Sequence, residues 1–372
     1  MTELDIELTM IPRLGNIGIA RLIEEFGDAE SIFTAPPEEL SSRLKLADDI
    51  IKHITRRSCR GAALAEMEYC RKHSITPIAI GDEHYPALLS QANDAPHVIY
   101  AKGSVEALGG TMLSIVGTRR MTPYGERVTT QIVDELSERV PNLTIVSGLA
   151  FGIDSAAHRA AVRSGVVTIA VLPNPLPEVT PVQHTNLARD ILSNGGVVIS
   201  ELNSRTKMNG RYYKPRNRII AAMSSVTLVV ESGYDGGAIS TAEYAFGYSR
   251  EVMAVPGRIT DITSTGCNRL IRDEIAKPVI SSEDIIRAAM WDVTQDVTPR
   301  SSGVVDMSNF NKEQVGLLKY LNYCQEPPSM NHLLEITALD SGTLSMLLME
   351  LEFAGAIKLI PGQRYMLIKR LE

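Results

Sequence analysis

The chain has 372 residues, of which 44% are hydrophobic and 22% are charged, values typical of a globular protein with two or three domains. It contains no run of roughly 18 apolar residues that would span a membrane, and the acidic N-terminus lacks the basic and apolar pattern of a secretory signal. The four cysteines are scattered without a CxxC pair, which excludes a Cys-rich zinc site of the usual spacing and favours a reducing cytoplasm.

The net charge of −7 opposes long-range attraction of a nucleic acid. A groove that is basic locally can still bind phosphate on an acidic protein. The order of charged residues along the chain is therefore more informative than their sum.

Residues 1–75 show short amphipathic patterns typical of a small helical module. Gly15 and Gly18 are expected to separate one helix from the next, as in helix-hairpin-helix or SAM-like modules, which often bind DNA backbone through exposed amides. A purely structural helical cap is the favoured alternative, because Asn16 and Ile17 supply no charge. Residues 76–109, with several Pro, His and Asp residues, are expected to form a connector or extra strands.

Residues 110–290 alternate apolar, β-branched runs with helical patterns. Strands are predicted at residues 112–116, 143–146, 166–172, 197–199, 226–230, 251–255 and 278–280. Helices are predicted at residues 125–139, 155–164, 185–193, 216–223 and 241–249. Apolar strands joined by helices favour an α/β fold: an extended Rossmann-like, doubly wound and mostly parallel sheet that is covered on both faces.

The C-terminal part begins with a polar stretch, residues 291–308, that is predicted to be a linker. Residues 309–372 then show three helical segments and a hairpin, a winged-helix pattern. The predicted elements are helices 312–324, 330–336 and 341–353 and hairpin strands 356–360 and 364–368. The third helix is acidic and rich in Met and Leu, so contact with a protein is favoured over reading of a DNA duplex.

The carboxyl ends of the strands are where a doubly wound sheet binds its ligand. After the first parallel strand, Gly117 lets the backbone approach a ligand, and Thr118 and Arg119 offer a hydroxyl and a guanidinium. After the second, Ser147 and Gly148 begin a tight turn into a helix whose free amides favour an anion.

Further along the second turn, Asp154 is expected to cap a helix and His158 to pack or to form a hydrogen bond. A third turn of this kind follows the fifth strand, where Gly237 and Ser240 stand at a helix start. Three such turns on one edge indicate a phosphate ligand but do not distinguish a nucleotide from a polymer.

Residues 205–218 combine basic and aromatic side chains without any acidic residue. The cations are Arg205, Lys207, Arg211, Lys214, Arg216 and Arg218. One or two cations suffice for a mononucleotide, whereas cations alternating with tyrosines suit a strand whose phosphates and bases are both exposed. The alternative is a solvated basic loop, or guanidiniums that pair with the carboxylates of the chain.

Signatures of catalysis are missing from the sequence. There is no Walker A motif, no GxGxxG after the first strand and no His, Asp and Glu grouping with metal-ligand spacing. The candidate acids are Glu201, Glu231, Asp235 and Glu243, and the sequence marks no pair of them as acid and base. Neither an enzyme nor a cofactor or metal site is therefore predicted.

The chain resembles the DprA/Smf family of bacterial DNA-processing proteins in motifs that follow the family order over roughly residues 110–290. These motifs are SIVGTRR, VSGLAFGIDSAAH, TIAVLPN, NGGVVISE, PRNRIIAAMS, LVVESGYDGGAISTA, EVMAVPG and GCNRLI. The resemblance implies a Rossmann-like cytoplasmic protein that forms a homodimer and holds single-stranded DNA in a basic pocket. It also implies delivery of that DNA to the RecA recombinase in natural transformation and recombination.

The same resemblance implies site residues. Tyr213 takes the place of a phenylalanine that usually precedes Arg-Asn-Arg in the family, and Lys214-Pro215 reverses the common order of Pro and a basic residue. Phe151 occupies a position that often holds a basic residue. The predicted DNA-contacting residues are Gly117, Thr118, Arg119, Ser147, Gly148, Lys207, Arg211, Tyr213, Lys214, Arg216, Asn217, Arg218, Gly237 and Ser240.

Two other functional classes remain open on the sequence. The segment from Gly236 to Glu243 is similar to the phosphate-binding motif of lysine-decarboxylase-like phosphoribohydrolases, which cleave nucleotides on a related fold. The other class is an interaction scaffold with vestigial nucleic-acid binding. The basic and aromatic segment favours DNA over both.

Overall fold

The computed structural model describes residues 2–291, 293, 304–305, 307, 310–324, 327–337, 339–360, 364–367 and 370–371. The chain forms two compact units, Met1–Thr294 and Gln295–Glu372, and the boundary falls inside the stretch predicted to be a linker. Among the residues that the structure describes, no helix combines the length and the apolar character needed to cross a bilayer.

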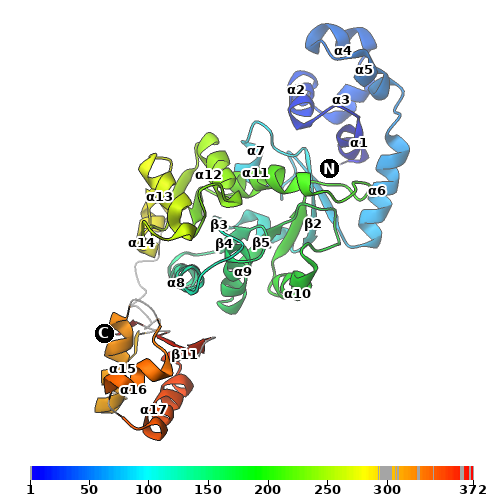
Figure 1. The fold of residues 1–372 in the computed structure, drawn as a ribbon. Helices are drawn as coiled ribbons and strands as arrows, with labels where there is room; N and C mark the ends of the chain where they lie inside the picture. Colours follow the sequence, from blue (N-terminus) through cyan, green and yellow to red (C-terminus); the bar gives the residue numbers. More distant parts are fainter. Residues whose placement is uncertain are drawn as a thin grey trace. The chain divides into compact units, whose positions relative to one another are not determined.

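The first unit begins with six helices. They are α1 (Glu3–Met10), α2 (Asn16–Phe26), α3 (Ala29–Thr34), α4 (Pro37–Leu44), α5 (Asp48–Thr55) and α6 (Arg60–Lys72). In Figure 1, α1 to α5 form a cluster and α6 runs beside it. Fully buried Ile and Leu side chains from α2 to α5 form their shared core. Gly18 does not break a helix as predicted: it lies inside α2, where a Cβ atom would come 2.8 Å from Leu14 Cδ1. The glycine therefore serves close packing of the preceding segment.

The sheet of this unit has nine strands in the order β1-β2-β6-β5-β4-β3-β7-β8-β9. The strands are β1 (Thr76–Ala79), β2 (Val98–Gly103), β3 (Thr111–Val116), β4 (Leu143–Ser147), β5 (Val167–Val171), β6 (Val197–Ser200), β7 (Val226–Val229), β8 (Glu251–Ala254) and β9 (Lys277–Pro278). β2 runs antiparallel to both β1 and β6, and the other neighbours are parallel. Residues 76–103 thus contribute two strands to the same sheet.

Helices cover both faces of this sheet (Figure 1). They are α7 (Ala87–Ser90), α8 (Pro123–Arg139), α9 (Ile153–Arg163), α10 (Thr185–Ser193), α11 (Tyr213–Met223), α12 (Gly237–Gly247), α13 (Thr265–Arg272) and α14 (Ser282–Ala289). Successive side chains of a strand point to opposite faces. In β3, Met112 and Val116 accordingly pack with α11 and α12, whereas Leu113 and Ile115 pack with α8 and α9. The central strand is buried on both faces, as the apolar run predicted.

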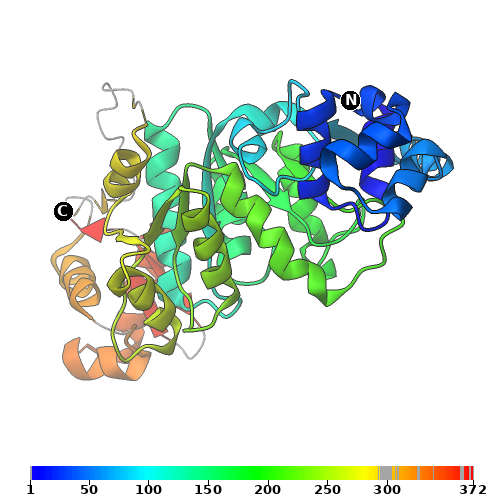
Figure 2. The ribbon, with the colours of Figure 1, turned by 90° about the horizontal axis from the view of Figure 1, so that it is seen from above.

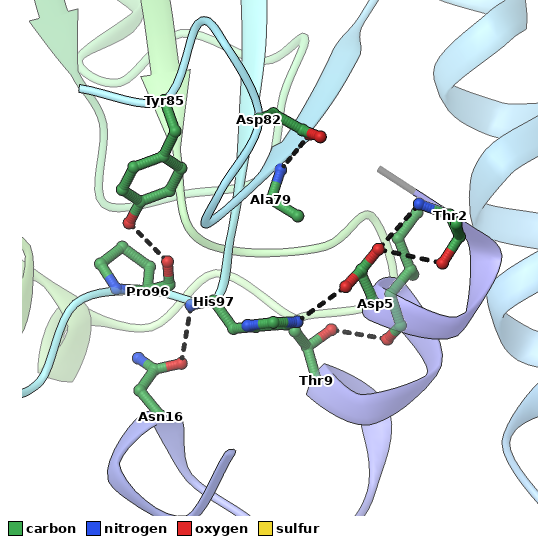
Figure 3. A network of polar contacts seen from close by, with 10 residues as sticks. Thr2, Asp5, Thr9, Asn16, Ala79, Asp82, Tyr85, Pro96 and His97 are labelled. Carbon is green, nitrogen blue, oxygen red and sulfur yellow. Dashed lines mark hydrogen bonds and ion pairs between the residues drawn. The ribbon is translucent and has the colours of Figure 1, made fainter. Parts of the chain in front are cut away.

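The N-terminal helices pack against the β1 and β2 end of the sheet (Figures 1 and 2). Figure 3 shows the polar contacts that accompany this packing. Asp5 of α1 lies 3.0 Å from His97 Nε2, and the side-chain oxygen of Asn16 accepts from the His97 backbone N–H at 3.4 Å. Tyr85 donates its hydroxyl to Pro96 O at 2.6 Å in the same segment. The helical module and the sheet therefore share one interface inside this unit.

The second unit is built from three helices and a hairpin. These are α15 (Lys312–Tyr323), α16 (Met330–Thr337), α17 (Ser341–Phe353), β11 (Ile357–Ile360) and β12 (Arg364–Leu367), and short β10 (Val304–Val305) pairs with β13 (Arg370–Leu371). Leu side chains of all three helices form the core. The third helix keeps Met346, Met349 and Phe353 exposed. The assignment of a winged helix stays a prediction.

Candidate nucleic-acid interface

The strand order of the sheet changes direction at β3. The chain proceeds from β3 through β4 and β5 to β6 in one direction and then returns to place β7 on the opposite side of β3. The loops that leave β3 and β7 therefore diverge at the carboxyl edge, which is where doubly wound sheets bind ligands. These loops are residues 117–122 and 230–236.

The loop after β3 is fixed by its backbone and exposes Arg119. A Cβ atom on Gly117 would lie 2.9 Å from Glu231 O, so only glycine fits there. The Thr118 N–H donates to Glu231 O at 2.6 Å, and the Thr118 hydroxyl accepts from the Arg120 N–H at 3.2 Å. The side chain of Arg119 is exposed at this rigid tip.

Glu231, one of the candidate acids, holds this loop in place. Its buried carboxylate accepts from the Thr122 N–H at 2.8 Å and from the Thr122 hydroxyl at 2.6 Å, and Thr263 approaches at 3.5 Å. Because several donors already occupy the carboxylate, it serves as a structural clamp. Sequence reasoning missed this role, since the partner Thr122 is more than a hundred residues away in the chain.

The loop after β4 is occupied by internal contacts. Ser147 is fully buried and donates its hydroxyl to Ile115 O at 2.6 Å, so this side chain cannot reach a surface ligand. Asp154 does not cap α9 as predicted, because Gly152 is the N-cap residue. The Asp154 carboxylate instead accepts from the N–H groups of Gly148 and Ala150, at 3.2 and 3.4 Å. Burial raises its pKa.

Arg216 and Arg218 correct the interpretation of the basic segment as a row of solvent-facing cations. Arg216 is 4% exposed and Arg218 is 8% exposed. The Arg216 guanidinium donates to Gly148 O at 2.7 Å and to Val171 O, and burial lowers its pKa to about 10. Arg218 donates to Asp94 O at 2.8 Å and to the Glu201 carboxylate. Both guanidiniums are therefore engaged by the interior and are not free to bind a phosphate on the surface.

Other cations of the segment are solvent-exposed, in contrast to Arg216 and Arg218. Lys207, Arg211 and Lys214 are exposed, and none of them forms an ion pair with a carboxylate in the part of the chain that the structure describes. The Arg119 guanidinium lies 5.1 Å from the centroid of the Tyr213 ring. This cation–π contact joins the tip of β3 to the first turn of α11.

Asn217 extends the same surface to the third turn. It lies one helical turn after Tyr213 on α11, so the two side chains share a face. The Asn217 amide donates to Gly237 O and to Ser240 Oγ, both at 3.3 Å. The structure thus links Arg119, Tyr213 and, through Asn217, Gly237 along one edge of the sheet.

The remaining candidate acids are held by arginines. Glu201 pairs with Arg218, and Glu243 and Asp235 lie 3.4 and 3.8 Å from Arg269. Among the described residues, no group of His, Cys, Asp and Glu side chains is placed to hold a metal ion. The acidic groups of this edge therefore position arginines and loops.

Residues 76–290 match the family model described as DNA recombination-mediator protein A. The chain is 33% identical over 255 residues to DNA processing protein DprA of Bacillus subtilis (strain 168). This alignment covers 65% of this chain and 84% of that relative. It is 38% identical over 195 residues to protein Smf of Escherichia coli (strain K12), with 52% of each chain covered.

Two solved structures have the same fold. The structure of DprA from Streptococcus pneumoniae superposes with a TM-score of 0.67 at 28% identity, covering 77% of this chain and 98% of that one. The second structure is that of DNA processing protein A from Helicobacter pylori, described for its single-stranded DNA binding mode. It superposes with a TM-score of 0.51 at 25% identity, covering 58% of this chain and 95% of that one.

Proposed function

Because the chain belongs to the DNA recombination-mediator protein A family, which includes the DprA and Smf proteins, we propose that it binds single-stranded DNA at the carboxyl edge of its sheet. The observation that carries the proposal is the contact of Arg119 with Tyr213, together with exposed cations of the same basic segment that have no carboxylate partner among the described residues. The protein holds the DNA and does not alter it chemically.

The chemistry of this edge fits an unpaired strand. Arg119, Lys207, Arg211 and Lys214 supply charges for successive phosphates, and the half-buried Tyr213 ring supplies a surface for a base. The exposed start of α12 at Gly237 adds backbone amides that favour an anion. In a duplex the base faces are stacked inside and cannot reach an aromatic side chain. The proposed site therefore prefers single-stranded DNA and reads no sequence.

Competition between single-stranded and double-stranded DNA of the same length, at one salt concentration, tests the proposal. The expected result is tighter binding of the single strand, with similar affinities for strands of different sequence. Binding that is tighter for the duplex would contradict the proposed function. A Tyr213→Phe variant, which keeps the ring, serves as the control for a Tyr213→Ala variant, whose affinity falls for all sequences alike.

We further propose that the bound strand is delivered to the RecA recombinase and that the protein acts as a cytoplasmic homodimer. The description of the family as a recombination mediator supports delivery, and the resemblance to the DprA/Smf proteins is the basis for the dimer. Assembly of RecA filaments on a strand covered by single-strand-binding protein measures delivery, and filaments should form faster when the protein is present. An unchanged rate would contradict delivery, and a monomer in sedimentation at micromolar concentration would contradict the dimer.

A further inference from the structure

An aromatic side chain that the proposed site has not yet used lies at the tip of β4. Phe151 is 44% exposed, although phenylalanine is normally buried. It lies in the loop between β4 and α9, and β4 is the strand next to β3. We propose that Phe151 is a second base-stacking surface of the DNA site, which accepts the base next to the one on Tyr213. This inference rests on the proposed function and names a further contact within it.

The backbone places Phe151 beside Arg119. The next residue, Gly152, has φ +79°, and a Cβ atom there would lie 2.9 Å from Arg119 Cα. The Ile153 N–H also donates to Thr118 O at 3.2 Å. The loops after β3 and β4 are therefore in direct backbone contact, which puts the backbone of Phe151 close to that of Arg119.

The loop that carries Phe151 is held rigidly from several sides. Leu149 is fully buried in the left-handed region at φ +53°, a conformation that is unfavourable for a bulky residue and is retained only where the surroundings impose it. His184 donates its Nδ1–H to Leu149 O at 2.7 Å. Asp154 accepts from Gly148 and Ala150, the residues on either side of Leu149. Strain held in place in this way indicates a preorganised surface.

The ring itself is oriented by an aromatic contact. The Phe151 and His184 ring centroids are 4.7 Å apart, at an interplanar angle of 61°. His184 is buried, so one side of the Phe151 ring is fixed against the protein and the exposed part faces solvent. An uncharged ring cannot neutralise a phosphate, whereas it can stack on any base. We therefore expect Phe151 to contact a base of the strand and not its phosphate backbone.

The test compares oligothymidylate with a strand of equal length whose central nucleotides lack bases. Phe151→Ala and Phe151→Leu should each lower the affinity for oligothymidylate about tenfold, within the range for one stacked base, and should leave the affinity for the abasic strand unchanged. Phe151→Trp should retain binding. Phe246→Ala, which removes an exposed ring at the opposite end of α12 from Gly237, is the matched control and should bind like the wild type.

A lysine at the same position gives a second readout. Phe151→Lys should steepen the log–log salt dependence by about 0.7, the contribution of one neutralised phosphate, while it reduces the discrimination between normal and abasic strands. In the Phe151→Leu variant, leucine keeps an apolar contact with His184. If only the alanine variant fails to fold, the leucine variant therefore still tests the role of Phe151. Equal losses on the normal and abasic strands, or no loss in the leucine variant, would overturn the role of Phe151. A wild-type protein that binds neither strand would instead contradict the proposed function itself.

Discussion

Arg119 and Arg216 carry the same charge and face the same edge of the sheet, but their surroundings give them different tasks. Arg119 is exposed and stacks on Tyr213, whereas Arg216 is buried against two backbone carbonyls. A sequence shows the charge but not the carbonyls that surround it. The six cations of residues 205–218 could therefore not be divided into exposed and buried ones before the structure was known.

Arg119→Ala should weaken binding of single-stranded DNA about tenfold, since it removes one charge-assisted contact worth about 1.5 kcal/mol. The loss of its exposed cation–π contact should cost less than about 1 kcal/mol of folding stability. Fluorescence anisotropy and thermal unfolding measure the two effects. The same substitution at Arg71, an exposed arginine of α6, should leave the affinity unchanged. Equal affinities of the Arg119 variant and wild type would remove Arg119 from the site.

Arg216→Ala should lower the free energy of unfolding by about 3 kcal/mol, because it leaves buried carbonyls without a donor and removes the cation near buried Asp154. Urea unfolding measures this loss. An Arg216→Ala variant that is as stable as wild type but no longer binds DNA would contradict the interior role and indicate that Arg216 contacts the DNA.

His158 makes the stability of the first unit depend on pH. Its Nδ1–H donates to the Thr168 hydroxyl at 2.7 Å, and its Nε2 has no hydrogen-bond partner among the described residues. Burial lowers its pKa to about 3. The unfolded chain takes up this proton near pH 6.5 and the folded protein does not. Stability should therefore fall by about 1.4 kcal/mol per pH unit from about pH 6.5 towards pH 3. Urea unfolding between pH 7 and pH 5 should show a smaller fall in His158→Asn, and equal falls would contradict this assignment.

Strands β3 to β9 were predicted from sequence to within a few residues, because buried parallel strands are continuous apolar runs, whereas β1 and β2 fell in the stretch expected to be a connector or extra strands. Helix starts were predicted less well. α11 begins at Tyr213, three residues before the predicted start, since Pro215 lies in the first turn, where its missing N–H does not matter. α12 begins at Gly237, within a glycine pair that lowers helix propensity in isolation. In both helices the missed turn carries residues of the candidate site.

A contact between α6 and the loop that follows β6 supports the basic segment. The buried carboxylate of Glu66 accepts from the Ser204 N–H at 2.8 Å and from its hydroxyl at 2.5 Å. This contact anchors the start of residues 204–212, which carry Lys207 and Arg211. No pattern in the sequence pairs these two segments, because they lie 138 residues apart.

Glu66→Ala should therefore increase hydrogen exchange of the backbone amides in residues 204–212 and weaken DNA binding a few-fold. The reason is that a loosened loop must be ordered when the strand binds. Glu7→Ala is the control, since Glu7 is also buried but bonds to Arg57 within the N-terminal helices. Unchanged exchange in residues 204–212 would contradict the anchoring role.

Across the whole molecule, the net charge of −7 coexists with a local excess of exposed cations at one sheet edge. Ion pairs hold many arginines elsewhere on the first unit, whereas Arg119, Lys207, Arg211 and Lys214 have no carboxylate partner among the described residues. The order of charges along the sequence indicated a basic segment at this edge, and the structure buries two of its cations, Arg216 and Arg218.

The salt dependence of binding to single-stranded DNA tests this account most directly. Four exposed cations that neutralise phosphates should give a log–log slope of about −3 for the wild-type protein, from about −0.7 for each phosphate. Replacing Arg119, Lys207, Arg211 and Lys214 by alanine should bring the slope close to zero in a protein that remains folded. A flat salt response of the wild type, or an unchanged slope in the quadruple variant, would contradict the claim that these side chains form one groove for an unpaired strand.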